Sequence, residues 1–204
     1  MWILASASPR RKELLAEIIP EFEVIPSQAD ETVKEKLSPK ALVNLLATRK
    51  ALEVASRPEC EGKFIVGADT VVAYGKEILG KPTDGADAFR MLKMLSGEKH
   101  TVYTGVCICV CKDGKIGYTT KVAKTKVYFN ELENDFVWKY IRGGSPMDKA
   151  GAYGIQDGDL VAKIKGSYSN VVGLPVELCK KMISKINNKK KAFNAYLPLS
   201  FLGK

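Results

Sequence analysis

The sequence predicts an α/β protein built on a mixed twisted sheet with flanking helices. Two observations carry this prediction. Short apolar segments typical of buried strands alternate along the 204 residues with segments of helical periodicity. The dipeptide Asp113-Gly114 stands between two long strand-like segments, residues 101–112 and 115–129, which is a strong hairpin signal. At least one strand pair is therefore expected to be antiparallel in an otherwise alternating α/β pattern.

The first half of the chain is expected to supply short strands and three helices. The clearest helix start is Ser8-Pro9, because Ser8 has the character of an N-cap and Pro9 that of a first helical residue. The expected strands cover residues 2–5, 22–26, 64–68 and 71–74, and the expected helices begin at Pro9, at Ser38-Pro39 and at Asp84.

The second half continues the alternation after the hairpin. The expected elements are a helix over 131–142 that ends at Gly143-Gly144, a glycine-rich segment over 145–159, a strand over 160–165, a polar loop, and a last helix from Pro175. We expect one domain over residues 1–188, because 46% hydrophobic residues in this length suffice for one substantial core. Residues 189–204 are expected to form a basic C-terminal tail.

The charge distribution argues against nucleic acid as the main partner. The net charge is +9, but seven lysines and no acidic residue lie from Lys180 to the end. The first 179 residues therefore carry about +2, which is ordinary for a globular domain. A solvated, partly ordered tail is the favoured interpretation, and a weak surface for nucleic acid or anionic lipid is the alternative.

Composition also bears on location. No apolar run approaches the roughly 18 residues of a membrane span, and no signal peptide is visible, so a cytoplasmic protein without membrane contact is expected.

Cys107, Cys109 and Cys111 alternate along one expected strand and share one face. Their spacing matches neither a disulfide nor a zinc site, which favours buried apolar side chains.

A phosphate site is predicted at the start of the first helix. The run Ser6-Ala7-Ser8-Pro9-Arg10-Arg11 places two hydroxyls and two guanidinium groups where free backbone N–H groups and the positive end of the helix dipole point. The alternative is an ordinary helix start with solvated arginines.

Other polar residues stand in breaks between the expected elements. Asp69 interrupts an apolar run, which is costly unless the carboxylate is paired, hydrogen-bonded or bound to a metal. We expect it at a strand end facing a cleft, with a turn-capping aspartate as the alternative. Lys81 lies between Gly80 and Pro82, which would aim its side chain, although a plain turn lysine has the same pattern. Glu31 and Lys50 are unremarkable alone.

The glycine-rich segment and the missing residue types narrow the chemistry. Gln156 could pair with a base edge, because an amide offers both a donor and an acceptor. His100 is the only histidine, so histidine-based catalysis and histidine metal sites are excluded. Neither a P-loop nor a dinucleotide-binding motif is present either. Carboxylates with lysines and arginines suit Mg²⁺ or Mn²⁺ and a polyphosphate.

Taken together, these segments resemble the Maf family of nucleoside triphosphate pyrophosphatases over nearly the whole chain. The motifs that carry the resemblance are Ser6-Ala7-Ser8-Pro9-Arg10-Arg11, Gly67-Ala68-Asp69-Thr70-Val71-Val72, Gly80-Lys81-Pro82, the run from Asp148 to Gln156, and the run from Gly166 to Pro175. The chain departs from the pattern at Asp157-Gly158-Asp159, where relatives are richer in glycine, and in its basic tail.

The resemblance implies a fold with two lobes around a central cleft, a divalent metal cation (Mg²⁺ or Mn²⁺) and, in many members, a homodimer. It implies hydrolysis of a nucleoside triphosphate to the monophosphate and pyrophosphate. The chain resembles the dTTP/UTP subgroup, and modified pyrimidine nucleotides are further candidate substrates. The positions that set this preference are Arg11, Lys81 and Gln156, with Thr70 shaping the selection.

The remaining roles follow from the same resemblance. Asp69 is expected to be the general base and, with Glu31, a metal ligand. The triphosphate is expected to contact Ser8, Arg10, Arg11, Lys50 and Lys81. Two alternatives stay open: a 7-methyl-GTP pyrophosphatase of the same fold, and a non-catalytic nucleic-acid-binding or septum-formation regulator, which only the basic tail supports.

Overall fold

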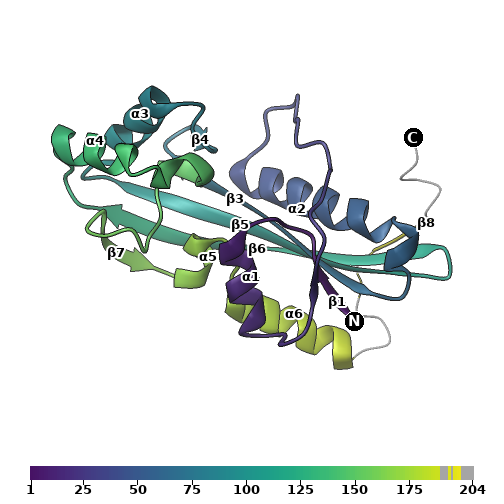
Figure 1. The fold of residues 1–204 in the computed structure, drawn as a ribbon. Helices are drawn as coiled ribbons and strands as arrows, with labels where there is room; N and C mark the ends of the chain where they lie inside the picture. Colours follow the sequence, from purple (N-terminus) through teal and green to yellow (C-terminus); the bar gives the residue numbers. More distant parts are fainter. Residues whose placement is uncertain (189–192, 194, 199–204) are drawn as a thin grey trace. The chain divides into compact units, whose positions relative to one another are not determined.

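The structure is a computed structural model that describes residues 1–188, 193 and 195–198 (Figure 1). Its strands are β1 (Trp2–Leu4), β2 (Glu23–Val24), β3 (Phe64–Tyr74), β4 (Glu77–Leu79), β5 (Lys99–Lys112), β6 (Lys115–Phe129), β7 (Val161–Lys165) and β8 (Ala195–Pro198). Its helices are α1 (Pro9–Ala16), α2 (Pro39–Ala55), α3 (Gly85–Leu95), α4 (Asn134–Arg142), α5 (Tyr168–Val172) and α6 (Val176–Asn188). Short 3₁₀ turns cover Pro58–Cys60, Ser145–Asp148 and Ala150–Ala152.

The strands form one mixed sheet, as predicted. Its order is β2-β1-β3-β5-β6-β7, with β4 paired to β3 and β8 paired to β6. β1 is parallel to β2 and β3, whereas β4, β7 and β8 are antiparallel to their neighbours. The β5–β6 hairpin turns at Asp113 and Gly114, whose φ angles of 52° and 68° are those of a two-residue hairpin turn.

The contacts divide the chain into two compact units. The first contains residues 1–69, 104–123 and the described residues from 173 onward, and the second contains 70–103 and 124–172. The expected boundary between a domain over 1–188 and a tail over 189–204 stays a prediction, because Lys189, Lys190, Lys191 and Lys204 lie outside the described residues. Within that tail, Ala195–Pro198 is a strand paired with β6 rather than a plain extension.

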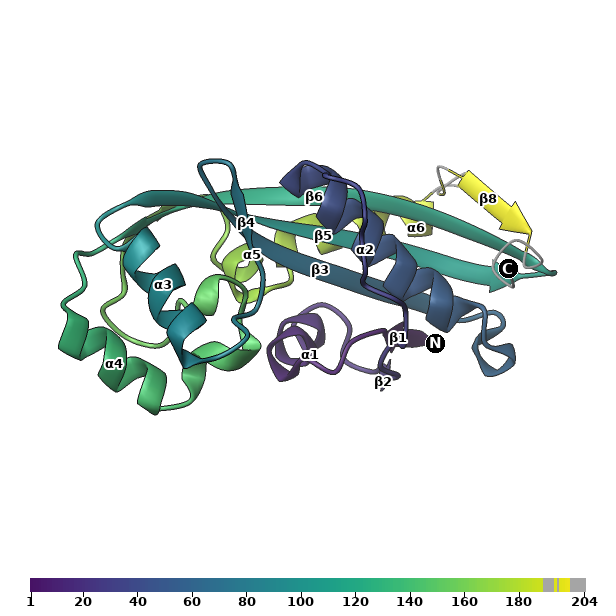
Figure 2. The ribbon, with the colours of Figure 1, turned by 90° about the horizontal axis from the view of Figure 1, so that it is seen from above.

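In the first unit, α2 covers one face of the sheet and α1 and α6 cover the other (Figures 1 and 2). Small residues allow α2 to approach closely. A Cβ on Gly67 would lie 2.6 Å from the carbonyl oxygen of Ala47 and 2.8 Å from the Cβ of Ala51, and a Cβ on Gly105 would overlap the carbonyl of Val43. The core on this side includes Cys107, Cys109 and Cys111, which are buried free thiols, as predicted.

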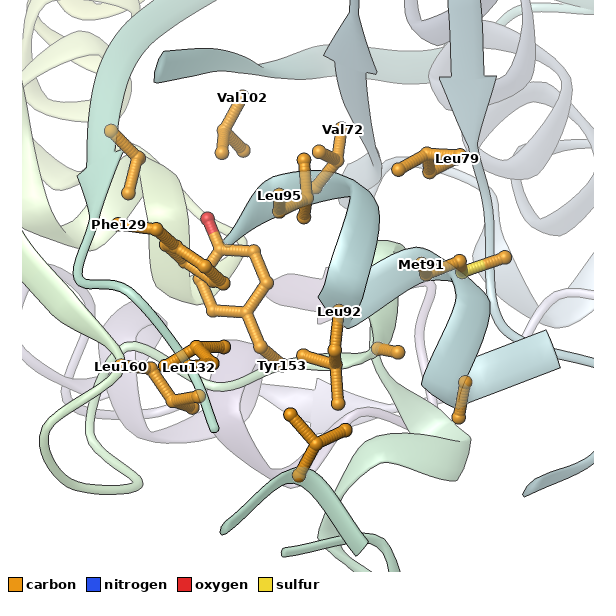
Figure 3. Close-up of a cluster of buried hydrophobic side chains, with 14 residues drawn as sticks. Val72, Leu79, Met91, Leu92, Leu95, Val102, Phe129, Leu132, Tyr153 and Leu160 are labelled. Atoms are coloured by element: carbon orange, nitrogen blue, oxygen red, sulfur yellow. The ribbon is translucent and has the colours of Figure 1, made fainter. Parts of the chain in front are cut away.

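In the second unit, a separate apolar core packs around Tyr153 (Figure 3). The ring of Tyr153 meets that of Phe129 edge to face, with centroids 4.7 Å apart. Side chains from α3, among them Leu92 and Leu95, close the cluster. This core therefore anchors the segment that continues from Tyr153 into the turn over residues 154–157.

His100 should make folding stability depend on pH. Its side chain is 2% exposed and its Nε2 lies 2.7 Å from the Tyr153 hydroxyl, and burial lowers the pKa of His100 to about 4. Between the ordinary value of 6.5 and this value the unfolded chain binds a proton that the folded chain does not. The contribution of His100 to the free energy of unfolding is therefore complete above its ordinary pKa. It falls as the pH drops toward the pKa of His100 in the folded protein, and about 2 kcal/mol is lost at pH 5.

Urea unfolding of the protein and of His100→Gln at pH 8 and pH 5 measures this term. The variant keeps a hydrogen-bonding group but does not titrate, so its stability should change less with pH than that of the unaltered protein. Equal changes in the two proteins would contradict the prediction.

Besides β8, further elements differ from expectation. Residues 22–26 supply only the two-residue strand β2, β4 has no counterpart among the expected strands, and the polar loop after β7 contains the one-turn helix α5. None of the helices in the part of the chain that the structure describes is long and apolar enough to cross a bilayer.

Candidate functional site

The turn between β1 and α1 has the predicted capping geometry. Ser8 is the N-cap of α1, and its Oγ accepts a hydrogen bond from the backbone N–H of Arg11 at 3.4 Å. The N–H of Ser8 in turn donates to the Oγ of buried Ser6 at 3.2 Å. Arg10 is half-buried in the first turn of the helix. The predicted strand–turn–helix is thus confirmed, with Ser8 and Arg10 at the helix N-terminus.

Arg11 links this turn to the segment before α6. Its Nε donates to the carbonyl of Gly173 at 3.0 Å, and its Nη1 donates to Ser6 Oγ at 3.4 Å. Burial lowers the pKa of Arg11, while the negative charges of Asp69 and Glu31 oppose this shift. Arg11 is therefore both a structural bridge and a cation within electrostatic reach of two carboxylates.

Lys50 joins the two carboxylates that the resemblance pointed to. Its Nζ lies 2.7 Å from Asp69 Oδ1 and 3.0 Å from Glu31 Oε2. The side chains of Lys50 and Asp69 are 13% and 10% exposed, whereas that of Glu31 is 59% exposed. A nearly buried ion pair is thus open to solvent on the side of Glu31. These three residues, 19 positions apart on either side of Lys50, form one constellation.

The expectation that Asp69 stands at a strand end is wrong. Asp69 lies within the eleven-residue strand β3, which runs without a break from Phe64 to Tyr74. The strand can continue through a carboxylate because Lys50, reaching across from α2, offsets the cost of burying it. Gly67 and Asp69 share one face of the strand. The close approach of α2 over Gly67 therefore also places Lys50 over Asp69.

The loop that carries Glu31 is fixed to α2 by residues that the sequence did not single out. Arg49 Nη1 donates to the carbonyls of Asp30 and Thr32, at 3.2 and 2.9 Å, and so holds the backbone on both sides of Glu31. Glu53, one turn further along α2, accepts hydrogen bonds from the Gln28 N–H and the Ser27 hydroxyl, both at 2.8 Å. The only signal in the sequence was the four-residue spacing of charges at 49, 53 and 57.

The carboxylates of the site fit a divalent cation whose remaining coordination positions are filled by a bound ligand. Among the described residues no group of three or more His, Cys, Asp or Glu side chains could hold a metal ion. Mg²⁺ is usually bound by one or two carboxylates together with phosphate oxygens and water. Glu31 and Asp69, both in contact with one ammonium group, supply two such carboxylates.

The other predicted site residues belong to the second unit. The N–H of Gly151 donates to the carbonyl of Gly80 at 2.9 Å, so the structure brings the turn of Lys81 beside the glycine-rich segment. Lys81 and Gln156 are exposed. Thr70 follows Asp69 in β3 and is half-buried. In the first unit, Ser8, Arg10, Arg11, Glu31, Lys50 and Asp69 complete the predicted set.

The fold and these residues define a class of protein. A mixed α/β sheet that presents paired carboxylates, lysine and arginine is suited to binding phosphorylated ligands. The structure of the Staphylococcus aureus Ham1 protein is similar to this chain at a TM-score of 0.52 and 14% sequence identity, covering 92% of this chain and 99% of that one. At this identity the likeness concerns the fold alone.

Sequence comparison gives the family. A family model described as Maf-like protein matches residues 1–186, and the chain belongs to the Maf family. It is 48% identical over 184 residues to the dTTP/UTP pyrophosphatase of Thermococcus gammatolerans, covering 89% of this chain and 95% of the relative. It is 49% identical over 184 residues to that of Thermococcus kodakarensis, with the same coverage, and 48% identical over 189 residues to that of Agathobacter rectalis, covering 85% and 91%.

Proposed function

We propose that this chain hydrolyses dTTP and UTP, and modified pyrimidine nucleotides of the same shape, to the monophosphate and pyrophosphate. The observation that carries the proposal is the contact of Lys50 with both Asp69 and Glu31, beside the cationic helix start at Arg10 and Arg11. The relatives named dTTP/UTP pyrophosphatase support the same reaction and substrates.

The chemistry assigned to these residues is a displacement at the α-phosphorus. A water oxygen forms a bond to that phosphorus, Asp69 accepts the proton of the water, and the bond to the bridging oxygen of the pyrophosphate breaks. Pyrophosphate leaves with the bonding electron pair. The residues that bind the triphosphate are Ser8, Arg10, Arg11, Lys50 and Lys81, the arginines through paired N–H donors. The cations among them also stabilise the negative charge that develops on the leaving pyrophosphate.

A divalent cation, Mg²⁺ or Mn²⁺, would be held by Glu31 and Asp69. When bound it would neutralise charge on the phosphate oxygens. Lys50 balances the same carboxylates in its absence.

Glu31→Gln should raise the Mg²⁺ concentration needed for half-maximal pyrophosphate release by roughly tenfold, because one charged ligand is lost. Binding of Mn²⁺ to the protein, followed by electron paramagnetic resonance without turnover, should weaken in parallel. Glu35→Gln, which removes an exposed charge from the same loop, is the matched control. Unchanged Mn²⁺ binding in Glu31→Gln would remove Glu31 from the metal site.

Base recognition is assigned to Gln156, with Arg11, Thr70 and Lys81 shaping the choice. An exposed amide at the tip of a turn can donate and accept at the edge of a pyrimidine. The alternative within the family is 7-methyl-GTP, which would keep the chemistry and change only the base.

Pyrophosphate release from dTTP, UTP, CTP, 5-methyl-UTP, GTP and 7-methyl-GTP, each with Mg²⁺, with Mn²⁺ and without metal, tests the proposal. Metal-dependent cleavage that favours dTTP and UTP is the expected result. Preference for 7-methyl-GTP would overturn the assignment of the base. Cleavage of none of them would overturn the enzyme proposal and favour the non-catalytic regulator.

We further propose a homodimer that works in the cytoplasm, with no membrane partner and with nucleic acid playing no part in catalysis. The match of the family model to residues 1–186 supports a catalytic domain that ends near residue 188. Light scattering of the purified protein tests the dimer, and a monomeric mass at micromolar concentration would contradict it.

A further inference from the structure

The residue assigned to base recognition lies at the tip of a closed turn. The backbone N–H of Asp157 donates to the carbonyl of Gly154 at 3.1 Å, which closes a four-residue turn over residues 154–157. Gln156 is the third residue of this turn and its side chain is exposed. The direction in which Gln156 points is therefore set by whatever holds residues 154 and 157.

One hydroxyl group holds both ends of that turn. The Tyr140 hydroxyl, from α4, donates to Asp157 Oδ2 at 2.7 Å and accepts from the backbone N–H of Gly154 at 3.1 Å. A hydroxyl has one proton to donate and lone pairs to accept, so the two bonds are compatible. The bond to the carboxylate is charge-assisted and correspondingly strong.

The ammonium group of Lys149 completes the arrangement. Its side chain is 11% exposed, and its Nζ lies 3.6 Å from Asp157 Oδ2 and 3.1 Å from Asp148 Oδ1. Gly154 fits beneath this pair only because it has no side chain: a Cβ there would lie 2.5 Å from Asp157 Oδ2 and 2.9 Å from Lys149 Cε. Tyrosine, lysine and aspartate thus close tightly on the glycine.

We propose that Tyr140, with Asp157 and Lys149, is a positioning group that fixes the turn of Gln156 and thereby sets the discrimination between bases. The inference rests on the proposed function, because it names the residues that orient its recognition group. An amide discriminates bases only if its donor and acceptor are held in place, and the adjacent Gly158, at a φ of 105°, provides no restraint of its own. Asp157, at which the chain departs from the family pattern, thereby acquires a role as the acceptor of the Tyr140 hydroxyl.

Tyr140→Phe removes the hydroxyl and keeps the ring. The expected result is a rise of about tenfold in KM for dTTP with little change in kcat. The ratio of kcat/KM for dTTP to that for CTP or GTP should fall by about tenfold as well. Tyr128→Phe is the matched control: Tyr128 lies on β6 in the same unit, with Lys165 over its ring, and its substitution should change neither quantity.

A double-mutant cycle shows whether Tyr140 acts through Gln156. Gln156→Ala should itself narrow the base preference, and adding Tyr140→Phe to it should narrow the preference little further. Amide hydrogen exchange of residues 154–157 should accelerate in Tyr140→Phe and not in Tyr128→Phe. Exchange at the α4 backbone should be unchanged in both, which separates a loosened turn from a destabilised fold.

The outcomes separate this inference from the proposed function. Cleavage of dTTP by the unaltered protein, with an unchanged base preference in Tyr140→Phe, would overturn the positioning role alone. Full additivity of the two substitutions would do the same. An unaltered protein that cleaves no nucleotide would overturn the proposed function and the discrimination role with it.

Discussion

Asp69→Asn should lower kcat for dTTP by roughly 10²–10⁴-fold, because the amide cannot accept the proton of the attacking water. The substitution keeps the shape of the side chain, and its oxygen can still accept the hydrogen bond that Lys50 Nζ donates at 2.7 Å. At a saturating Mg²⁺ concentration, which offsets the loss of one charged metal ligand, nucleotide affinity should therefore remain within about threefold of that of the unaltered protein.

Steady-state pyrophosphate release gives kcat, and isothermal titration with a non-hydrolysable dTTP analogue gives the affinity. Asp113→Asn is the matched control, because it makes the same chemical change in the exposed tip of the β5–β6 hairpin, where asparagine tolerates the positive φ angle. Turnover that survives in Asp69→Asn would assign the base to another group.

Gly67→Ala should destabilise the protein by roughly 3 kcal/mol, although it adds a single methyl group. The new Cβ would lie 2.6 Å from the carbonyl oxygen of Ala47 and 2.8 Å from the backbone nitrogen of Ala51. Neither backbone atom can rotate away, so α2 must move off β3. Since α2 carries Lys50, the ion pair with Asp69 should loosen and activity should fall as well.

The unfolding free energy from urea titration measures the first effect, and pyrophosphate release by the fraction that remains folded measures the second. Gly85→Ala is the control, because its Cβ would meet only the Cγ2 of Ile141 at an ordinary 3.5 Å. If Gly67→Ala is no less stable than Gly85→Ala, the close approach of α2 does not limit the packing.

Local signals predicted most of the fold. Ser8-Pro9, Ser38-Pro39 and Asp113-Gly114 each determine their own backbone geometry, and all three appear as expected. The prediction that β3 breaks at Asp69 was wrong because the compensating charge, Lys50, comes from a helix 19 residues earlier. No local pattern reveals a partner at that distance.

The sequence indicated the candidate site residues themselves but not the residues that hold them in position. Asp69 and Arg11 were noticeable in the sequence because a charge in an apolar run, or a cation at a helix N-terminus, needs a reason. Arg49 and Tyr140 gave no such signal. Arg49 resembles any helix-surface arginine, and Tyr140 any residue of the amphipathic α4, until the loop and the turn that they hold are seen in three dimensions.

The glycines beneath α2 and the loop that rests on α2 differ in how much sequence change each would tolerate. A Cβ on Gly67 would overlap backbone atoms of Ala47 and Ala51, and a Cβ on Gly105 would overlap the carbonyl of Val43, so neither glycine has room for a side chain. A library that varied them would yield mostly unfolded protein. The loop over residues 26–32 rests on α2 through polar contacts, so it can be diversified around a fixed Arg49 and Glu53. Metal affinity is the property that such a library would alter first.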